Sequence, residues 1–300
     1  MTAAALAPRR GEAWCPHAGG MHRVAYVEWG DPSAPRTLFC VHGLTRTGRD
    51  FDPLAQALSG EWRVICPDVV GRGRSDWLPH PAGYSIAQYV SDMIALLAQL
   101  RVDALDWVGT SMGGLIGIGV AALPESPVRS LVLNDVGPRL QAEGLAKIAS
   151  YAGTARRFPS RAAGLAYLRG IMDGFGPHSD AQWRMLNDAM LVAEDAGPGV
   201  VLHYDPQIAQ PFRAEAALSP ASLHAAETML WTAYDAIQCP ILVLRGACST
   251  LLGAATVDEM LARAGGRARA VEIAGVGHAP TLVDPAQIAV VRDFLQTVAY

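Results

Sequence analysis

Five residues, Gly109-Thr110-Ser111-Met112-Gly113, constrain the fold of this chain more than any other feature of the sequence. They follow a short β-type run, Leu105–Val108, and lead into an apolar helical run, Leu115–Ala122. Glycine two positions to either side of a serine is typical of a sharp strand-to-helix turn, where larger side chains would collide with the backbone. Such a turn exposes the serine hydroxyl and aims the positive end of the helix at it, so Ser111 is predicted to be a nucleophile. The alternative is a serine in a purely structural turn.

From His22 onward, short β-type runs alternate with longer helical patterns. The β-type runs are His22–Trp29, Thr37–Val41, Arg63–Cys66, Leu105–Val108, Ser130–Leu133, Ile241–Leu244 and Ala268–Ile273, and clear helical periodicity covers Ser85–Leu100 and Pro285–Val298. This alternation predicts an α/β fold with a doubly wound, mostly parallel sheet that helices cover on both faces. Residues 1–20 are rich in Ala, Pro and Gly without periodicity and are predicted to be a flexible leader.

The alternation stops between residues 137 and 236, where helical stretches such as Leu145–Ala155 and Ala181–Ala193 are separated by Pro and Gly and no strand is expected. We interpret residues 137–236 as a helical cap inserted into a core made of residues 21–136 and 237–300. Covering an active site is a common task of such an insertion, and a merely structural subdomain is the alternative.

Composition excludes several classes of protein. The chain has 300 residues, 51% of them hydrophobic and 17% charged, with a formal net charge of −4. These values are typical of a globular protein, and the absence of a block of like charge argues against a nucleic-acid partner.

Targeting and metal signals are also weak. Arg9 and Arg10 follow the short N-terminal Ala/Leu run, the reverse of a secretory signal, and the longest apolar stretch, Gly113–Leu123, is too short to span a bilayer. We therefore expect a cytoplasmic protein with no membrane partner. The five cysteines form no metal-binding pattern, so no metal and no cofactor are expected. The oligomeric state cannot be read from the sequence, and a homo-oligomer stays possible.

A second chemical element is His278, in Gly275-Val276-Gly277-His278-Ala279-Pro280. It lies between the last predicted strand and the terminal helix, on a loop that returns to the sheet edge where Ser111 is expected. Imidazole is the best general base near neutral pH, so His278 is predicted to activate Ser111. A plain surface histidine is the alternative.

A third element, His42-Gly43-Leu44, follows the strand Thr37–Val41. A loop leaving a strand beside the nucleophile can point the N–H of Leu44 into the site, and together with the N–H of Met112 it would form an oxyanion hole. His42 and Gly43 would orient this loop, and a structural role fits His42 better than a catalytic one.

Several of these motifs, in this order, resemble the α/β-hydrolase superfamily. The motifs are His42-Gly43, the run from Asp68 to Ser75, Gly109 to Gly114, and Gly277-His278, and the resemblance extends from His22 to the C-terminus. It implies an eight-stranded core, a helical cap between strands six and seven, and hydrolysis without a cofactor. In such proteins the segment Gly71 to Ser75 forms a structural turn.

The acid of the triad departs from the family pattern. The resemblance places it four residues beyond Gly246, where this sequence has Thr250, and threonine cannot carry the charge that holds the histidine in the right tautomer. Asp135, at the end of the sixth strand, is the predicted substitute, since some relatives keep their acid there. A structural carboxylate at the cap hinge is the alternative for Asp135, and Asp258 is a weaker candidate inside a predicted helix.

These residues predict a serine hydrolase that cleaves an ester, thioester or lactone of a small, largely apolar substrate through an acyl-enzyme. Hydrolysis of a carbon–carbon bond and perhydrolysis stay open, because the same triad serves both. A non-catalytic small-molecule receptor is the alternative from another class, motivated by Thr250. The identity of the substrate is beyond these residues.

Overall fold

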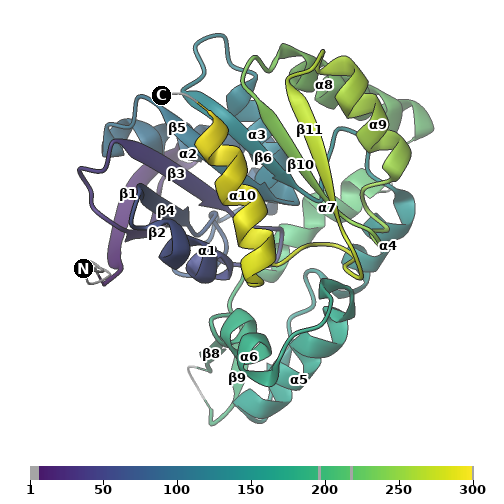
Figure 1. The fold of residues 1–300 in the computed structure, drawn as a ribbon. Coiled ribbons are helices and arrows are strands. Elements are labelled where there is room, and N and C mark those ends of the chain that lie inside the picture. Colours follow the sequence, from purple (N-terminus) through teal and green to yellow (C-terminus); the bar gives the residue numbers. More distant parts are fainter. Residues whose placement is uncertain (1–6, 195–196, 217–218, 299–300) are drawn as a thin grey trace.

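The computed structural model describes residues 7–194, 197–216 and 219–298. It is built on an eight-stranded sheet of order β1-β2-β4-β3-β5-β6-β10-β11 (Figure 1). The strands are β1 (Arg9–His17), β2 (Gly20–Trp29), β3 (Arg36–Val41), β4 (Trp62–Pro67), β5 (Leu105–Thr110), β6 (Val128–Asn134), β10 (Ile241–Gly246) and β11 (Ala268–Ile273). Only the pairs β1/β2 and β2/β4 are antiparallel in this sheet. The predicted doubly wound, mostly parallel sheet is confirmed.

Helices cover both faces of the sheet. Helices α1 (Asp52–Leu58) and α10 (Pro285–Thr297) pack on one face, and α2 (Ile86–Leu100), α3 (Met112–Ala121) and α9 (Ala254–Arg263) pack on the other (Figure 1). In β3, Leu38 and Cys40 face the first layer, while Phe39 and Val41 face the second. Burial on both faces explains why the central strands are apolar throughout.

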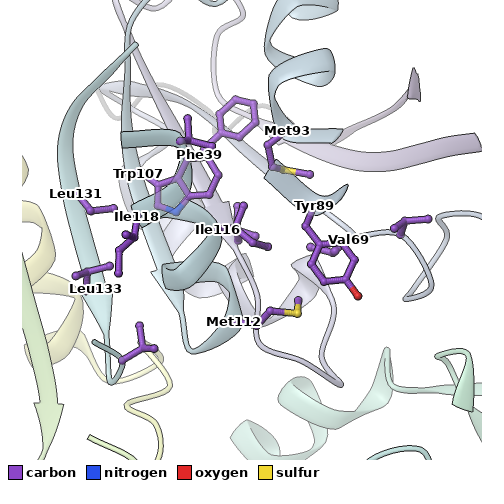
Figure 2. Close-up of a cluster of buried hydrophobic side chains, with 14 of the residues drawn as sticks. Phe39, Val69, Tyr89, Met93, Trp107, Met112, Ile116, Ile118, Leu131 and Leu133 are labelled. Atoms are coloured by element: carbon purple, nitrogen blue, oxygen red, sulfur yellow. The ribbon is translucent and has the colours of Figure 1, made fainter. Parts of the chain in front are cut away.

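The larger core cluster includes the buried apolar side chains between the sheet and helices α2, α3 and α9, and it holds the serine turn in place. Figure 2 shows Trp107 of β5 beside Phe39, and the two rings stack with centroids 6.1 Å apart. The Trp107 indole N–H donates to the carbonyl of Gly113, 3.1 Å away, in the first turn of α3. A side-chain carbon at Gly117 would lie only 2.5 Å from the indole nitrogen, so glycine is needed for α3 to approach β5.

Strand β1 corrects one prediction. Residues 9–17 form the antiparallel edge strand of the sheet, so a flexible leader over residues 1–20 was wrong for them. Ala13 and Cys15 point inward with 2% and 0% exposure, whereas the residues on either side of them are exposed. This two-residue period is short and lies among Pro and Gly, which concealed it. Residues 1–6 of the predicted leader lie outside the described residues.

The inserted region contains helices and a small sheet. Its α-helices are α4 (Ala142–Tyr151), α5 (Arg161–Ile171), α6 (Asp180–Asp188), α7 (Ala209–Ala216) and α8 (Pro220–Ala236), and it contains the short 3-10 helices η3 (Asp173–Phe175) and η4 (Pro206–Ile208). Two further 3-10 helices, η1 (Gly48–Phe51) and η2 (Pro81–Gly83), lie in the core. Strands β7 (Arg157–Phe158), β8 (Leu191–Ala193) and β9 (Val200–Leu202) form an antiparallel sheet of order β7-β9-β8. The expectation of no strand in this region was therefore wrong. Strands of two or three residues are too short to show alternation in a sequence.

Helix α8 (Pro220–Ala236) differs from the rest of the insertion. It lies beside α9, far from β8 and β9 (Figure 1). Its Trp231 and Tyr234 are buried in the larger core cluster, and the Tyr234 hydroxyl donates to the Met260 carbonyl of α9 at 3.0 Å. By its packing, α8 belongs with the core layer, although the sequence pattern predicts it to be part of the cap.

Candidate active site

Ser111 occupies the turn between β5 and α3. Its backbone has φ of 53° and ψ of −120°, a conformation that non-glycine residues rarely adopt. A side-chain carbon at Gly113 would lie 1.9 Å from the Val41 carbonyl oxygen, and one at Gly109 would lie 2.3 Å from the Gly113 carbonyl oxygen. Both flanking glycines are thus required by close backbone approach, as the sequence pattern predicts.

The structure brings Ser111, His278 and Asp135 into one hydrogen-bonded chain. The Nε2 atom of His278 lies 2.9 Å from the Ser111 Oγ, and its Nδ1 lies 2.8 Å from the Asp135 Oδ2. With a proton on Nδ1, the ring donates to the carboxylate and Nε2 accepts from the serine hydroxyl. Asp135 is fully buried, whereas the His278 side chain is 17% exposed. This arrangement can move the serine proton to His278 as Ser111 attacks a carbonyl carbon.

The Asp135 carboxylate is held by further donors. Its Oδ1 accepts from the Gly246 N–H at 2.9 Å, and its Oδ2 also accepts from the Ser249 hydroxyl at 2.6 Å. Hydrogen bonds to an ionised carboxylate favour the charged form and fix its orientation. Ser249 follows β10 in the same loop as Thr250, so this loop supplies a donor to the carboxylate where the family pattern has the acid itself.

Asn134, like Ser249, is a residue of the site that the sequence did not predict. Its side-chain amide donates to the Pro280 carbonyl at 2.8 Å and to the Thr110 hydroxyl at 2.9 Å. One buried amide therefore joins the histidine loop to the end of β5 beside Ser111. The only signal in the sequence was its position next to Asp135.

His42 is structural in its contacts. Its Nε2 accepts from the Val69 N–H at 2.9 Å, and its Nδ1 donates to the Gly43 carbonyl at 2.8 Å. Both ring nitrogens are occupied by backbone groups, and the side chain is fully buried. Burial lowers the pKa of His42 to about 3, with a smaller contribution from nearby arginines, so the imidazole is neutral.

The loop that His42 holds passes close to the serine. A side-chain carbon at Gly43 would lie 3.5 Å from the Ser111 Cβ, and Leu44 lines the same cavity as Ser111. The buried Arg72 ties this loop down, since its Nε donates to the Leu44 carbonyl at 2.8 Å. Met112 is the first residue of α3, where backbone N–H groups have no acceptor within the helix. An oxyanion hole formed by the N–H groups of Leu44 and Met112 stays a prediction.

A cavity of about 120 Å³ opens between the core and the inserted region. Ser111, His278 and Thr250 line it from the core side, and Lys147, Tyr151 and Phe175 line it from the cap side.

Arg46 joins the two sides of this cavity. Its guanidinium pairs with Asp50 of the core, donates to the Asn187 Oδ1 at 2.9 Å and to the Leu186 carbonyl at 2.6 Å, and is buried. These contacts hold the C-terminal end of α6 over the site.

The described residues contain one group of potential metal ligands, Cys15, His22 and Asp92, which lies in the core away from Ser111. His22 pairs with Asp92 at 3.0 Å, and the Cys15 thiol contacts the Asp92 carbonyl oxygen at 3.5 Å. Burial and the nearby Asp92 raise the pKa of Cys15 to about 12. Metals bind the thiolate, so these contacts fit a structural His–Asp pair better than a metal site. In the part of the chain that the structure describes, no helix has the length and apolar character needed to span a membrane.

Comparisons with known proteins place these observations in context. Residues 38–291 match the model of the Alpha/beta hydrolase family. The 3-hydroxybutyrate-oligomer hydrolase of Cupriavidus necator is 54% identical over 289 residues, which cover 96% of this chain and 97% of that protein. The 2-(acetamidomethylene)succinate hydrolase of Mesorhizobium japonicum is 28% identical over 76% of each chain. The crystal structure of an alpha/beta hydrolase from Novosphingobium aromaticivorans superposes with a TM-score of 0.83 at 36% identity, covering 96% of this chain and 99% of that one.

Proposed function

We propose that this chain, which belongs to the alpha/beta hydrolase family and is an enzyme, hydrolyses the ester bonds of short 3-hydroxybutyrate oligomers. Ser111 is the proposed nucleophile. The hydrogen-bonded chain Ser111–His278–Asp135 carries the proposal for the reaction. The relative that shares 54% identity over nearly the whole chain supports the choice of ester. Thioesters, lactones, carbon–carbon bonds and perhydrolysis, which the sequence left open, have no comparable support.

The proposed reaction proceeds in two halves. Ser111 Oγ attacks the ester carbonyl while its proton moves to the His278 Nε2, and the imidazolium formed is stabilised by Asp135. The tetrahedral intermediate collapses, the bond to the alcohol breaks, and His278 gives its proton to the departing alkoxide. Water then attacks the acyl-enzyme with His278 as base, which releases the acid and restores Ser111.

Electrostatic support for this path comes from backbone groups. The N–H of Met112 lies in the first turn of α3, where the helix dipole favours negative charge. Together with the Leu44 N–H it would stabilise the oxyanion, a contribution of about 3 kcal/mol for one such donor in other hydrolases.

Release of 3-hydroxybutyrate from its dimer and trimer, measured by chromatography, tests the substrate. We expect turnover by the unmodified chain and a loss of about 10⁴-fold or more in kcat for Ser111→Ala. Ser59→Ala, a serine at the end of α1, is the matched control and should leave the rate unchanged.

Labelling with a fluorophosphonate probe, followed by peptide mass spectrometry, tests the nucleophile independently. An adduct on Ser111 is expected. No adduct would overturn the assignment of Ser111, whereas an adduct with turnover of p-nitrophenyl butyrate but no release of 3-hydroxybutyrate would overturn the substrate alone.

A further inference from the structure

One face of α4 forms part of the cap side of the cavity. Gly144, Lys147, Ile148 and Tyr151 all line it, and their spacing of three, four and seven residues places them on one side of the helix. The Gly144 N–H donates to the Thr250 carbonyl at 2.9 Å, which fixes this face against the core. A lysine therefore stands on a helix face that otherwise presents uncharged side chains to the site.

Lys147 is the single lysine in the 300 residues, and all other basic side chains except histidine are arginines. Among the described residues that line the cavity from the cap, it is the charged one. Arg46, the other cation at this cavity, is already paired with Asp50 and bonded to the cap. Lys147 thus supplies the positive charge that a ligand can still reach.

The present partner of Lys147 is easily exchanged. Its Nζ lies 2.7 Å from the Asp173 Oδ1, and the two side chains are 50% and 70% exposed. Ion pairs this exposed contribute at most about 1 kcal/mol, so another carboxylate can replace Asp173 at little cost.

The ammonium lies close to the histidine loop. A side-chain carbon at Gly174 would lie 3.8 Å from both the Lys147 Nζ and the backbone nitrogen of His278, so these two nitrogens are within twice that distance of each other. The Gly174 carbonyl also accepts from the Gly277 N–H at 2.6 Å, which holds this part of the cap on the loop.

We propose that Lys147 binds the free carboxylate on the alcohol side of the scissile ester, so that the enzyme selects short acidic esters and cleaves the bond nearest to the carboxylate end. This inference rests on the proposed function. In a 3-hydroxybutyrate oligomer, the terminal alcohol unit carries its carboxylate two carbons from the ester oxygen, a span of about 4 Å at standard bond lengths. His278 protonates that oxygen as it departs, and Lys147 on the neighbouring cap face holds the carboxylate of the same unit. The enzyme would then release monomers from one end.

The first test compares the 3-hydroxybutyrate dimer with its methyl ester at the carboxylate. We expect the unmodified enzyme to prefer the free acid, and Lys147→Met to raise the KM for the free acid about 10- to 100-fold with little change in kcat or in hydrolysis of the methyl ester. Lys147→Arg should restore most of the preference, because it restores the charge. Arg169→Met, which removes an exposed cation of the cap paired with Asp180, is the matched control and should change neither substrate.

The second test does not depend on turnover. In the Ser111→Ala variant, the free dimer should protect the Lys147 amine from trinitrobenzenesulfonate, read at the Lys147 peptide by mass spectrometry, and the methyl ester should not. Equal protection by both, or none, would overturn the role of Lys147. Hydrolysis of both dimers at equal efficiency by the unmodified enzyme would do the same while leaving the proposed function in place. Protection of Lys147 without any hydrolysis of the dimer would instead contradict the proposed function alone.

Discussion

The two walls of the cavity are built in different ways. On the core side, Ser111 and Asp135 stand at the ends of neighbouring parallel strands, and backbone N–H groups and buried side chains fix them. On the cap side, a half-exposed lysine and apolar side chains reach the site from helices that touch the core at a few points. If the proposed function holds, this difference predicts that the core determines the reaction and that the cap determines which ester is cleaved. Substitutions in the core should therefore lower kcat for every ester, and substitutions in the cap should change KM for particular ones.

Among substitutions that leave Ser111 and His278 in place, replacement of Asp135 by Asn should have the largest effect. The amide keeps the shape but removes the charge that holds the proton on the His278 Nδ1, and a comparable change in a serine protease costs about 10⁴-fold in kcat. We expect a loss of about 10³- to 10⁴-fold with both p-nitrophenyl butyrate and the 3-hydroxybutyrate dimer, at unchanged KM. Asp258→Asn, an exposed carboxyl on α9, is the control. A rate within about tenfold of the unmodified enzyme would assign Asp135 a structural role only.

Arg46 joins the two walls, and its removal should separate stability from chemistry. Arg46→Met leaves Asp50 without its cation and the Leu186 carbonyl and Asn187 amide without a donor, a loss of about 3 kcal/mol for a buried charged group. Urea unfolding should show this loss, and KM should rise more for the dimer than for p-nitrophenyl acetate, since the small ester needs less of the cap. Arg49→Met removes a neighbouring cation, which lies in η1 and pairs with Asp52, and is the control. An equal rise in KM for both esters would argue against a cap that selects substrate.

The sequence predicted the core side of the site far better than the cap side. Ser111 and His278 follow strands whose apolar runs are easy to recognise, and parallel strands bring their ends to one edge of the sheet. Asp135 could be predicted because it ends the strand next to that of Ser111. The position of Lys147 at the cavity and that of Ser249 beside Asp135 could not be predicted, because the neighbours of a helix face or a loop hydroxyl are set only when the cap or the loop packs.

His42 makes the stability of the core depend on pH. Burial holds its pKa at about 3, against 6.5 for an exposed histidine, so below pH 6.5 the unfolded chain takes up a proton that the folded chain excludes. Its contribution to stability is complete above pH 6.5 and falls by about 1.4 kcal/mol per pH unit on acidification, or about 2 kcal/mol by pH 5.

The measurement compares the unfolding free energies of the unmodified enzyme and His42→Gln at pH 7.5 and pH 5. The glutamine amide can bond the same Val69 and Gly43 backbone groups but does not titrate, and all other ionisable groups are shared. The unmodified enzyme should lose about 2 kcal/mol more than the variant between the two pH values. Equal losses would show that His42 does not cause the acid sensitivity.

Ser249 should give the smallest of these effects and the finest test of the core wall. Its hydroxyl is one of three donors to Asp135, beside the Gly246 N–H and the His278 ring, so Ser249→Ala leaves the carboxylate charged but less firmly oriented. One lost hydrogen bond to a charged group corresponds to about tenfold in kcat, with KM for the dimer unchanged. Ser249→Thr retains the hydroxyl and should recover most of the rate. If Ser249→Ala raised KM for the dimer and left kcat intact, the loop between β10 and α9 would help to choose the substrate, as the cap is proposed to do. The division of roles between the two walls would then be wrong for this loop.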